Sequence, residues 1–513
     1  MHRTPSFRAR PWIYGALLLT VLVRGFMLVE KPFWRDEAWV ARLVEMPLRT
    51  SLAEPRTVPI GFLAAAQITA KLPIVPEISF RLLPLLSGLA VVPLLGLLAA
   101  ALGASAQIAV AVLWIAAGMP ALVYYSRELK SYGLDAFFAA LVPLLALQLF
   151  GRAAGPRLLG GHAAGALLIA ALLLAPWVSF GAMFAILAVL AWGWLAWWRD
   201  AAPATRRWWM LANASYATSF VLAYRVTVAT QVANPRLWQV WRGKLLEDVS
   251  PSLLTRTLTA MERYAGICTT YFFPGVWKIA LPLVLLGLFV WPRAWRRTVA
   301  WLLLGSGGLT VVAAVADRYL IATGRLLLFA APPLVLYAAA GIDAVARRLC
   351  AARAASFTVA GAAACGLLWS GIAVAHRVDY ENNFDTYFLC DIVHDVPALL
   401  DAAGIAIGPA EPVYIAQYAS RPFAFYARGR FADATVCKEP CDFDGVTNAW
   451  LAALHGRGWI MLAADERTRI ADLLPAYGAT YRLRLAARGA ELWEIQRPDA
   501  SVAPPSDAPN PAP

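Results

Sequence analysis

Long apolar runs alternate with short polar segments over most of this chain. A helix needs roughly twenty mostly apolar residues to cross the hydrocarbon core of a bilayer. By that measure about eleven runs qualify as spanning helices. They are Pro11–Val29, Leu82–Leu102, Ile108–Tyr125, Leu134–Phe150, His162–Trp177, Phe180–Trp198, Trp208–Thr230, Ala265–Trp291, Val299–Ala316, Leu326–Ala346 and Ser356–Ala375. The pattern therefore predicts a polytopic α-helical membrane protein, with residues 1–375 as its transmembrane module.

One apolar run, Val58–Leu72, is too short to span a bilayer and runs into the segment LPIVP. We interpret it as an interfacial helix that lies along the outer membrane surface. The first outer loop then covers residues 30–81, which is long for a simple connector. Long ordered loops on rigid scaffolds often carry function, so this loop is a candidate place for a site.

The pattern changes after Ala375. Short candidate strands, PVYIAQYA, GWIMLAA, TYRLRLAA and AELWEIQ, alternate with helical stretches such as NAWLAALHG and RTRIADLLPAYG. Alternation of this kind predicts a small α/β domain over residues 376–498. Residues 499–513, which end in SVAPPSDAPNPAP, have the composition of a disordered tail.

The composition supports a membrane protein. Of the 513 residues, 60% are hydrophobic and 15% are charged, whereas soluble domains are nearer half apolar and a quarter charged. The mean hydropathy is +0.59. The net charge of +13 comes from Arg and Lys scattered between apolar runs, so we attribute it to topology and lipid-surface contact and expect no nucleic-acid partner.

The charges of the loops predict an orientation. One set of loops carries arginines and almost no acids: Arg152, Arg157, Arg199, Arg206, Arg207, Arg293, Arg296, Arg297, Arg347, Arg348 and Arg353. The opposite loops mix both signs. The positive-inside rule then places the N-terminus in the cytoplasm and the C-terminal domain outside.

Six cysteines are too few for a disulfide scaffold in a chain of this length. Cys350 and Cys365 fall at or in predicted spans, where packing is their usual role. Cys437 and Cys441, with Cys390 nearby, lie in the C-terminal domain, and a structural disulfide there fits an extracytoplasmic location. The sequence leaves the pairing open. A metal site is less favoured than a disulfide, because no second Cys or His pair lies at a suitable spacing.

Asp36 and Glu37 stand between two tryptophans at the outer end of the first span. In one interpretation they are solvated loop acids that pair with Arg35 or Lys31. In the other, the carboxylate is partly desolvated beside Trp34, Trp39 and the bilayer edge, which makes it a better proton acceptor.

A second polar island, YYSRELKSYGLDAFF, covers Tyr124–Phe138. If it is helical, Glu128, Ser131 or Tyr132, and Asp135 share one face, and Arg127 and Lys130 project from an adjacent face. Asp135 would lie inside the next span, where an ionisable group suggests function. A polar cap with internal ion pairs is the alternative.

Arg318 and Arg325 lie at the outer end of the tenth predicted span. The planar guanidinium suits phosphate oxygens, although snorkelling to lipid headgroups would also explain both residues. Taken together, acids and arginines at one membrane face suit a substrate with a phosphate at the headgroup level and a tail in lipid. Transporters gather charges near the midplane instead.

Four stretches resemble the GT-C glycosyltransferases that use polyprenyl-phosphate sugars, in the branch of the protein O-mannosyltransferases and the lipid A aminoarabinose transferase. They are WRDEAW, RTVPIGFLAAAQ with EISFRLLPLLSGLAVVPLLGLL, YYSRELKSYGLDAFFAAL, and GRLLLFAAPPLVLYAAAGI. The resemblance covers about residues 10 to 375, and the C-terminal domain is far less diagnostic. It implies a GT-C fold of about eleven spans with a small extracytoplasmic α/β domain.

The resemblance also implies roles for individual residues. Asp36 matches the catalytic base, Glu37 its companion, Asp135 the second-loop acid and Arg325 a phosphate-binding position. Val58 stands before Pro59 where the aminoarabinose branch has Lys, so phosphate contact passes to Arg56. Further substrate-binding candidates are Arg127, Glu128, Lys130 and Arg318. The HPP-like pattern of the protein mannosyltransferases is absent, which weakens a protein acceptor.

These inferences predict an enzyme of the bacterial inner membrane with a periplasmic C-terminal domain. It would transfer a monosaccharide from a polyprenyl-phosphate donor to an envelope glycan, a glycolipid or a protein, with inversion at the anomeric carbon. No cofactor is implied with certainty, and arginines at the phosphate would make a metal unnecessary. The alternative is a lipid or polysaccharide transporter, or a membrane scaffold whose outer domain binds a partner.

Overall fold

The computed structural model describes residues 10–26, 28, 32–53, 58–154, 158–229, 246, 252–273, 276–290, 293–321, 324–375, 395–408, 411–438, 441–463, 466–487 and 489–498. These residues fall into two compact units. Unit 1 lies within Met1–Leu28, Met46–Val378 and Thr386–Leu389, and unit 2 lies within Val29–Glu45, Asp379–Asp385 and Cys390–Pro513.

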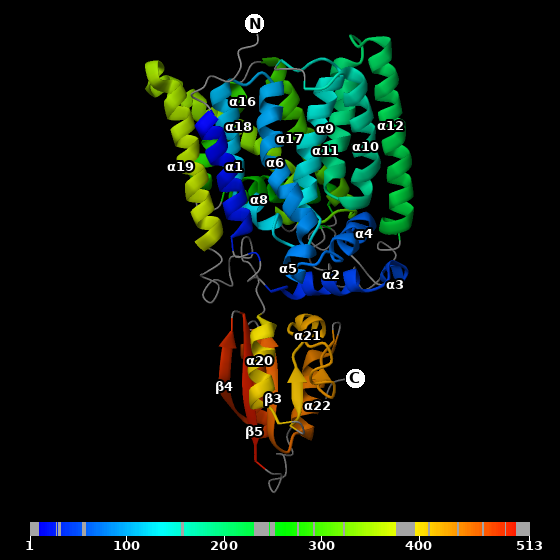
Figure 1. Cartoon of the computed structure of the whole chain (residues 1–513), viewed down its shortest axis with the longest axis vertical. Coiled ribbons are helices and arrows are strands. Elements are labelled where there is room, and N and C mark those ends of the chain that lie inside the picture. Colours follow the sequence, from blue (N-terminus) through cyan, green and yellow to red (C-terminus); the bar gives the residue numbers. More distant parts are fainter. Residues whose placement is uncertain are drawn as a thin grey trace. The chain divides into compact units, whose positions relative to one another are not determined.

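Unit 1 is a bundle of helices (Figure 1). Its α-helices are α1 (Arg10–Gly25), α3 (Leu48–Ala53), α4 (Ile60–Thr69), α5 (Pro76–Ser79), α6 (Leu82–Ala101), α7 (Ala106–Gly118), α8 (Pro120–Tyr125), α9 (Tyr132–Leu149), α10 (Gly161–Val178), α11 (Ala182–Trp192), α12 (Pro203–Ala223), α15 (Leu253–Gly266), α16 (Trp277–Val290), α17 (Arg293–Val315), α18 (Ala331–Leu349) and α19 (Ala354–Ala375). Short π- or 3-10-helical segments are η2 (Gly193–Trp197), η3 (Tyr224–Val228), η4 (Ile267–Tyr271), η5 (Gly324–Ala330) and η6 (Ala351–Arg353).

Among the described residues, six helices are long and apolar enough to cross a membrane: Leu82–Ala101, Tyr132–Leu149, Gly161–Val178, Arg296–Val315, Arg325–Leu349 and Ala354–Ile372. Each corresponds to a predicted span. The other five predicted spans form helices that are shorter or more polar, so the count of eleven is not confirmed. The polytopic, mostly helical architecture is confirmed.

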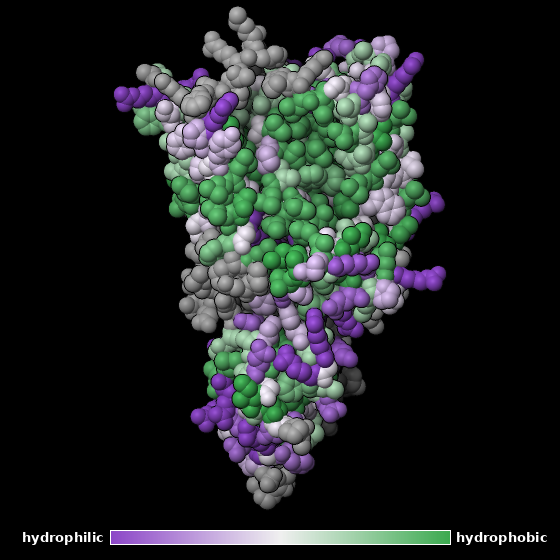
Figure 2. Space-filling model, in the orientation of Figure 1, coloured by the Kyte–Doolittle hydropathy of each residue, from purple (hydrophilic) through white to green (hydrophobic). Residues whose placement is uncertain are grey.

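The bundle has an inner and an outer layer. Burial reaches 83% of the apolar stretch of α9 and 89% of that of α18, against 39% for α19, so α9 and α18 are central. Outer helices expose large apolar side chains, among them Leu18, Leu22, Leu367 and Leu368. Figure 2 shows apolar residues covering the bundle's flank. A surface this apolar is suited to lipid rather than water.

Two predicted spans are interrupted. Ile108–Tyr125 forms α7 and α8, with a break at Met119, which has extended backbone (φ −58°, ψ 117°) before Pro120. The ring of a proline disfavours a helical conformation in the residue before it. Ala265–Trp291 likewise forms α15, η4 and α16, with the sequence FFPGV between the last two. Continuous helices over these runs were therefore wrong expectations.

The predicted short helix over Val58–Leu72 is α4, which packs on α10. Gly61 makes this contact possible, because a Cβ at that position would lie 2.7 Å from the carbonyl oxygen of Trp177. A larger residue would force the two helices apart. The helix is thus confirmed, and its place along the membrane surface stays a prediction.

Unit 2 contains a five-stranded sheet in the order β2-β1-β3-β5-β4. Its elements are α2 (Arg35–Glu45), α20 (Val396–Ala406), β1 (Val413–Ile415), α21 (Ser420–Tyr426), β2 (Thr435–Val436), α22 (Phe443–Ala453), β3 (Gly456–Ala463), α23 (Arg467–Leu473), η8 (Leu474–Tyr477), β4 (Thr480–Ala487) and β5 (Ala490–Arg497). β1 is parallel to β2 and β3, whereas β5 is antiparallel to β3 and β4.

Helices cover both faces of this sheet. Along β3, Trp459 and Met461 point into a core with α20 and α21, whereas Ile460 and Leu462 point into a core with α22 and α23. This alternation follows from the two-residue period of a strand. The predicted small α/β domain is therefore confirmed, with four of its strands where the sequence placed them and the two-residue β2 in addition.

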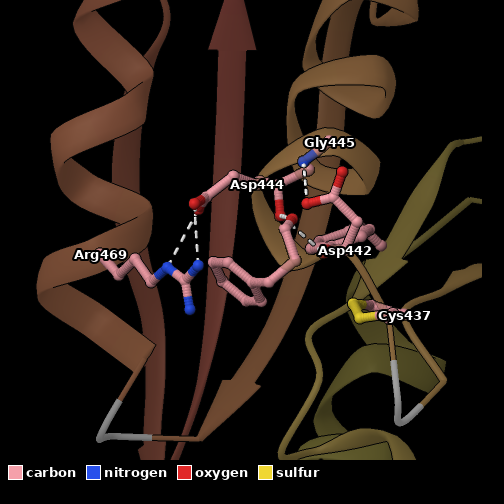
Figure 3. A network of polar contacts seen from close by, with 9 residues as sticks. Cys437, Asp442, Asp444, Gly445 and Arg469 are labelled. Atoms are coloured by element: carbon pink, nitrogen blue, oxygen red, sulfur yellow. Dashed lines mark hydrogen bonds and ion pairs between the residues drawn. A yellow bond between two sulfur atoms is a disulfide. The ribbon is translucent and has the colours of Figure 1, made fainter. Parts of the chain in front are cut away.

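Polar contacts fix the start of α22 (Figure 3). The Asp442 carboxylate accepts a hydrogen bond of 3.1 Å from the Gly445 backbone N–H, as a helix N-cap does. Arg469 of α23 donates two hydrogen bonds, of 3.0 and 2.8 Å, to Asp444. A disulfide joins Cys437 to Cys441 just before the helix. Cys390 lies outside the described residues.

Candidate active site

The acidic motif of the first loop forms the start of α2, in unit 2. Its first intrahelical hydrogen bond runs from the Ala38 N–H to the Trp34 carbonyl over 2.8 Å. Asp36 and Glu37 therefore occupy the first turn, where the helix dipole favours negative charge. The Glu37 side chain is fully buried and that of Asp36 is 20% exposed. A freely solvated loop does not describe these acids.

A basic residue of the C-terminal domain meets Asp36. The Arg421 guanidinium, on α21, lies 3.5 Å from Asp36 Oδ1 and 5.6 Å from the centre of the Trp39 ring. Both contacts fall within unit 2. The sequence carried no signal for this pairing, because 385 positions separate the two residues and no local pattern links them.

Asp135 lies in the first turn of α9, in unit 1, and is 2% exposed. Its carboxylate accepts a hydrogen bond from the Ser179 hydroxyl, and the backbone N–H groups of Gly181 and Ala182 stabilise its negative charge. The last two open α11, so a helix N-terminus points at the acid. A Cβ at Gly181 would lie 2.5 Å from Asp135 Oδ2, which explains why glycine stands there.

Arg325 lies beside the helix that carries this acid. Its guanidinium lies 5.9 Å from the centre of the Tyr132 ring, and Tyr132 precedes Asp135 by three residues on α9, which places both on one helix face. Tyr319 donates a hydrogen bond of 2.6 Å to the Leu326 carbonyl. Burial raises the pKa of Tyr319, and the nearby Asp135 and Tyr132 raise it further.

We call Tyr132, Asp135, Ser179, Tyr319 and Arg325 the α9 cluster. It combines a carboxylate bonded to the Ser179 hydroxyl with a guanidinium and two phenols. Sequence reasoning named Asp135 and Arg325 and mentioned Tyr132, but it missed Ser179 and Tyr319. Their roles are visible only once α9, α11 and η5 pack together.

The polar island before α9 is a turn rather than a helix. α8 ends at Tyr125 and α9 begins at Tyr132, so the predicted common helical face of Glu128 and Asp135 is wrong. The Ser126 hydroxyl turns back to donate a hydrogen bond of 2.6 Å to the Val123 carbonyl, which competes with helix continuation.

The charged residues of this turn are buried. Arg127 is 2%, Glu128 1% and Lys130 4% exposed. Arg24 of α1, which sequence reasoning did not single out, lies within electrostatic range of Arg127 and donates hydrogen bonds of 3.0 and 3.3 Å to the carbonyls of Ala117 and Ala116. Arg24 and Arg127 repel each other as like charges, and the cost of burying charged side chains marks this turn as a candidate part of the site.

Two other predicted phosphate ligands are not among the residues that make up the α9 cluster. Arg318 is exposed in the turn after α17, and Arg56 lies outside the described residues. The roles of both stay predictions, as does the convergence of Asp36 and Glu37 with the α9 cluster on one substrate. Within the described part of the chain, no three His, Cys, Asp or Glu side chains gather as a metal site requires.

No protein-family model matches the sequence, and no curated protein matches it significantly. Solved structures match in fold. The apo crystal structure of ArnT from Cupriavidus metallidurans has a TM-score of 0.57 at 12% identity, covering 95% of this chain and 98% of that one. The structure of the same protein bound to undecaprenyl phosphate has a TM-score of 0.54 at 13% identity, covering 94% and 98%.

A third similar structure is the Archaeoglobus fulgidus oligosaccharyltransferase in complex with zinc and sulfate. Its TM-score is 0.51 at 14% identity, and the match covers 93% of this chain and 72% of that one. ArnT and the oligosaccharyltransferase are both GT-C glycosyltransferases. This chain has the GT-C fold. The architecture that four degenerate motifs suggested is thereby confirmed, and the GT-C fold accounts for nearly the whole chain.

Proposed function

We propose that the protein is a glycosyltransferase of the bacterial inner membrane that takes a monosaccharide from a polyprenyl-phosphate donor. The observation that carries this proposal is the GT-C fold, shared over nearly full length with a protein crystallised with undecaprenyl phosphate. A multi-pass bundle with an apolar flank lies in lipid, and the hydrocarbon tail of a polyprenyl donor is soluble in the same lipid. The arginines offer positive charge to the phosphate of a phosphosugar, and the acids offer a proton acceptor and hydrogen bonds.

The reaction is a single displacement. An acceptor hydroxyl gives its proton to the Asp36 carboxylate while its oxygen attacks the anomeric carbon of the donor. The bond between that carbon and the phosphate oxygen breaks, and polyprenyl phosphate leaves with the electron pair. One displacement inverts the anomeric configuration. Glu37, buried next to Asp36, is the companion acid of this site.

Cations stabilise the departing phosphate. Arg325, with Arg56 or Arg318, offers permanently charged guanidinium groups to the oxygens on which negative charge grows. Arg127, Glu128 and Lys130 form a buried ionic turn beside α9 that shapes the donor site. Asp135, held by the Ser179 hydroxyl at the N-terminus of α11, orients the sugar or its phosphate.

The acceptor is an envelope glycan or a glycolipid in this proposal, with a protein as the less favoured choice. The oligosaccharyltransferase with a similar fold has been crystallised tethered to an acceptor peptide. The missing HPP-like pattern argues against that class of acceptor here. Under this proposal the N-terminus is cytoplasmic and the C-terminal domain periplasmic, as the loop charges predict.

Transfer by purified protein tests the proposal. The full chain in lipid nanodiscs is given radiolabelled polyprenyl-phosphate monosaccharides and an extract of envelope glycans and glycolipids. We expect label in the acceptor together with stoichiometric release of polyprenyl phosphate. Asp36→Asn should lower turnover by about 10² to 10⁴-fold, as loss of a general base does.

The matched control is Asp401→Asn, which neutralises an exposed acid of the same domain. It should retain wild-type turnover. Wild-type turnover in Asp36→Asn would refute the base assignment. If the lipid-linked sugar moved between leaflets and was transferred to no acceptor, the protein would be a transporter rather than an enzyme.

A further inference from the structure

The helix α21 of the C-terminal domain packs against the acidic face of α2. The Phe33 backbone N–H, just before α2, donates a hydrogen bond of 2.7 Å to the Tyr426 hydroxyl. The Phe33 ring packs against Phe425 at 5.3 Å and against Tyr426 at 6.2 Å. All these residues belong to unit 2, so α2 and α21 form one packed piece.

The contact covers the face that carries the proposed base. Asp36 and Trp39 are three residues apart on α2, which places them on one side of the helix, and Phe33 lies just before it. Arg421 of α21 touches two of them, since its guanidinium lies 3.5 Å from Asp36 Oδ1 and 5.6 Å from the Trp39 ring centre. The C-terminal domain therefore brings a permanent positive charge to the carboxylate.

This ion pair differs from the exposed pairs of the same domain. The side chains of Arg421 and Asp36 are 29% and 20% exposed, whereas those of Arg430 and Asp401 are 48% and 78% exposed at a separation of 3.2 Å. Exposed pairs contribute little because water and salt screen them. A partly buried pair whose guanidinium also rests on an indole is better defined in orientation.

We propose that Arg421 is a positioning residue for Asp36, so that the C-terminal domain is part of the catalytic machinery. The inference rests on the proposed function, in which Asp36 accepts the acceptor's proton. A general base must present its oxygen within hydrogen-bond reach and in a fixed direction. Arg421 exchanges no proton itself. Its guanidinium rests on the Trp39 ring, holds the carboxylate in place and stabilises its charged form before the acceptor arrives.

Steady-state kinetics of the full chain in nanodiscs tests this role. Arg421→Ala should lower kcat by about tenfold to a hundredfold, the effect of a misplaced catalytic group, while KM for the lipid-linked donor stays within about twofold. Arg421→Lys should recover most of the loss, because it restores the charge. Arg430→Ala, which removes a nearby arginine with an exposed partner, should leave both constants unchanged.

A double variant gives the sharper result. If Arg421 acts only through Asp36, then Asp36→Asn with Arg421→Ala should be no slower than Asp36→Asn alone. Additive losses would overturn the inference. A rise in donor KM with unchanged kcat would also overturn it, because Arg421 would then bind the donor phosphate instead of positioning the base.

Hydrogen exchange separates this inference from the proposed function. Arg421→Ala should speed exchange of the α2 amides around Asp36, and Arg430→Ala should not. If the wild-type protein transfers no sugar, the proposed function fails, and faster exchange at α2 still supports the positioning contact. Equal exchange in both variants, together with an unchanged kcat, would refute it.

Discussion

The Ser179 hydroxyl donates a hydrogen bond to Asp135 Oδ1, joining the loop before α11 to the first turn of α9. The same hydroxyl accepts a hydrogen bond of 3.2 Å from the Ala182 backbone N–H, so it links the carboxylate to a helix N-terminus. The arrangement leaves Asp135 little freedom to turn. A fixed acid at the end of a central helix is suited to orienting a substrate group.

Removing the hydroxyl tests that fixation. Ser179→Ala should cost about 1–3 kcal/mol, since it takes a donor from a buried carboxylate, and it should lower sugar transfer with it. Thermal unfolding in detergent and initial transfer rates measure the two effects. Ser370→Ala is the control, because that buried hydroxyl bonds the Gly366 carbonyl of its own helix over 2.7 Å and not a carboxylate. Equal stability in both variants would contradict the prediction.

Gly181→Ala should disturb the same acid by crowding. The added methyl would meet Asp135 Oδ2, and both the carboxylate and the α11 N-terminus would have to shift. We expect lower transfer rates than in Ser179→Ala, measured in the same assay. Gly266→Ala supplies the comparison, because a Cβ built there meets no described side chain or neighbouring helix within 4 Å. Normal transfer by Gly181→Ala would show that the position of Asp135 is unimportant.

The contact between Arg325 and Tyr132 predicts that the charge of Arg325 and the ring of Tyr132 contribute separately to lipid binding. Under the proposed function, Arg325→Ala should weaken binding of a polyprenyl phosphate by about tenfold to a hundredfold, the size of one charge-assisted contact. Arg325→Lys should recover part of the affinity, and Tyr132→Phe should keep it because the ring remains. Native mass spectrometry of the lipid complex measures all three. Arg348→Ala, exposed at the end of α18, should bind normally.

The sequence predicted the parts of the fold that depend on local pattern. The apolar period of α9 and the alternation along β3 follow from composition over ten to twenty residues, and both elements lie where they were expected. Breaks were harder to foresee. Met119, which precedes Pro120, interrupts one predicted span through a single proline effect inside an otherwise continuous apolar run.

The sequence predicted individual residues of the candidate site but not the contacts between them. Asp135 attracted attention because an acid inside a span is costly. Its partner Ser179 lies 44 positions away and has no local signature. Arg421 in turn stands in an ordinary helix of the C-terminal domain, and its pairing with Asp36 depends on how α21 packs against α2. Tertiary packing, not local propensity, decides such contacts.

Lowering the pH should reduce the stability of the C-terminal domain, because Glu411 becomes protonated. Burial alone would raise its pKa, but hydrogen bonds from the Gly408 N–H and the Trp459 indole, together with Arg457, lower it below the ordinary 4.5. A carboxyl with a depressed folded-state pKa stabilises the fold above pH 4.5 and loses that contribution as pH falls through the folded value. Hydrogen exchange of β3 in the full chain, measured from neutral to acidic pH, follows the loss.

Glu411→Gln isolates this contribution. The variant should exchange faster than wild type at neutral pH, and the difference should vanish at low pH, where Glu411 is protonated in both states. Asp433→Asn, at an exposed position of the same domain, should match wild type throughout. A constant difference between Glu411→Gln and wild type at every pH would mean that the charge of Glu411 is irrelevant and only its shape matters.

The disulfide between Cys437 and Cys441 makes the final prediction. Closing so short a loop should stabilise unit 2 by about 2 kcal/mol in the chain-entropy description. The loop leads into the Asp442 cap of α22, and the Cys437 side chain is 1% exposed within the core beside that helix. Replacing both cysteines by alanine should therefore speed hydrogen exchange in α22 and β2 while leaving α9 and α18 unchanged. Cys350→Ala, a free cysteine of unit 1, should leave the exchange of α22 at its wild-type rate.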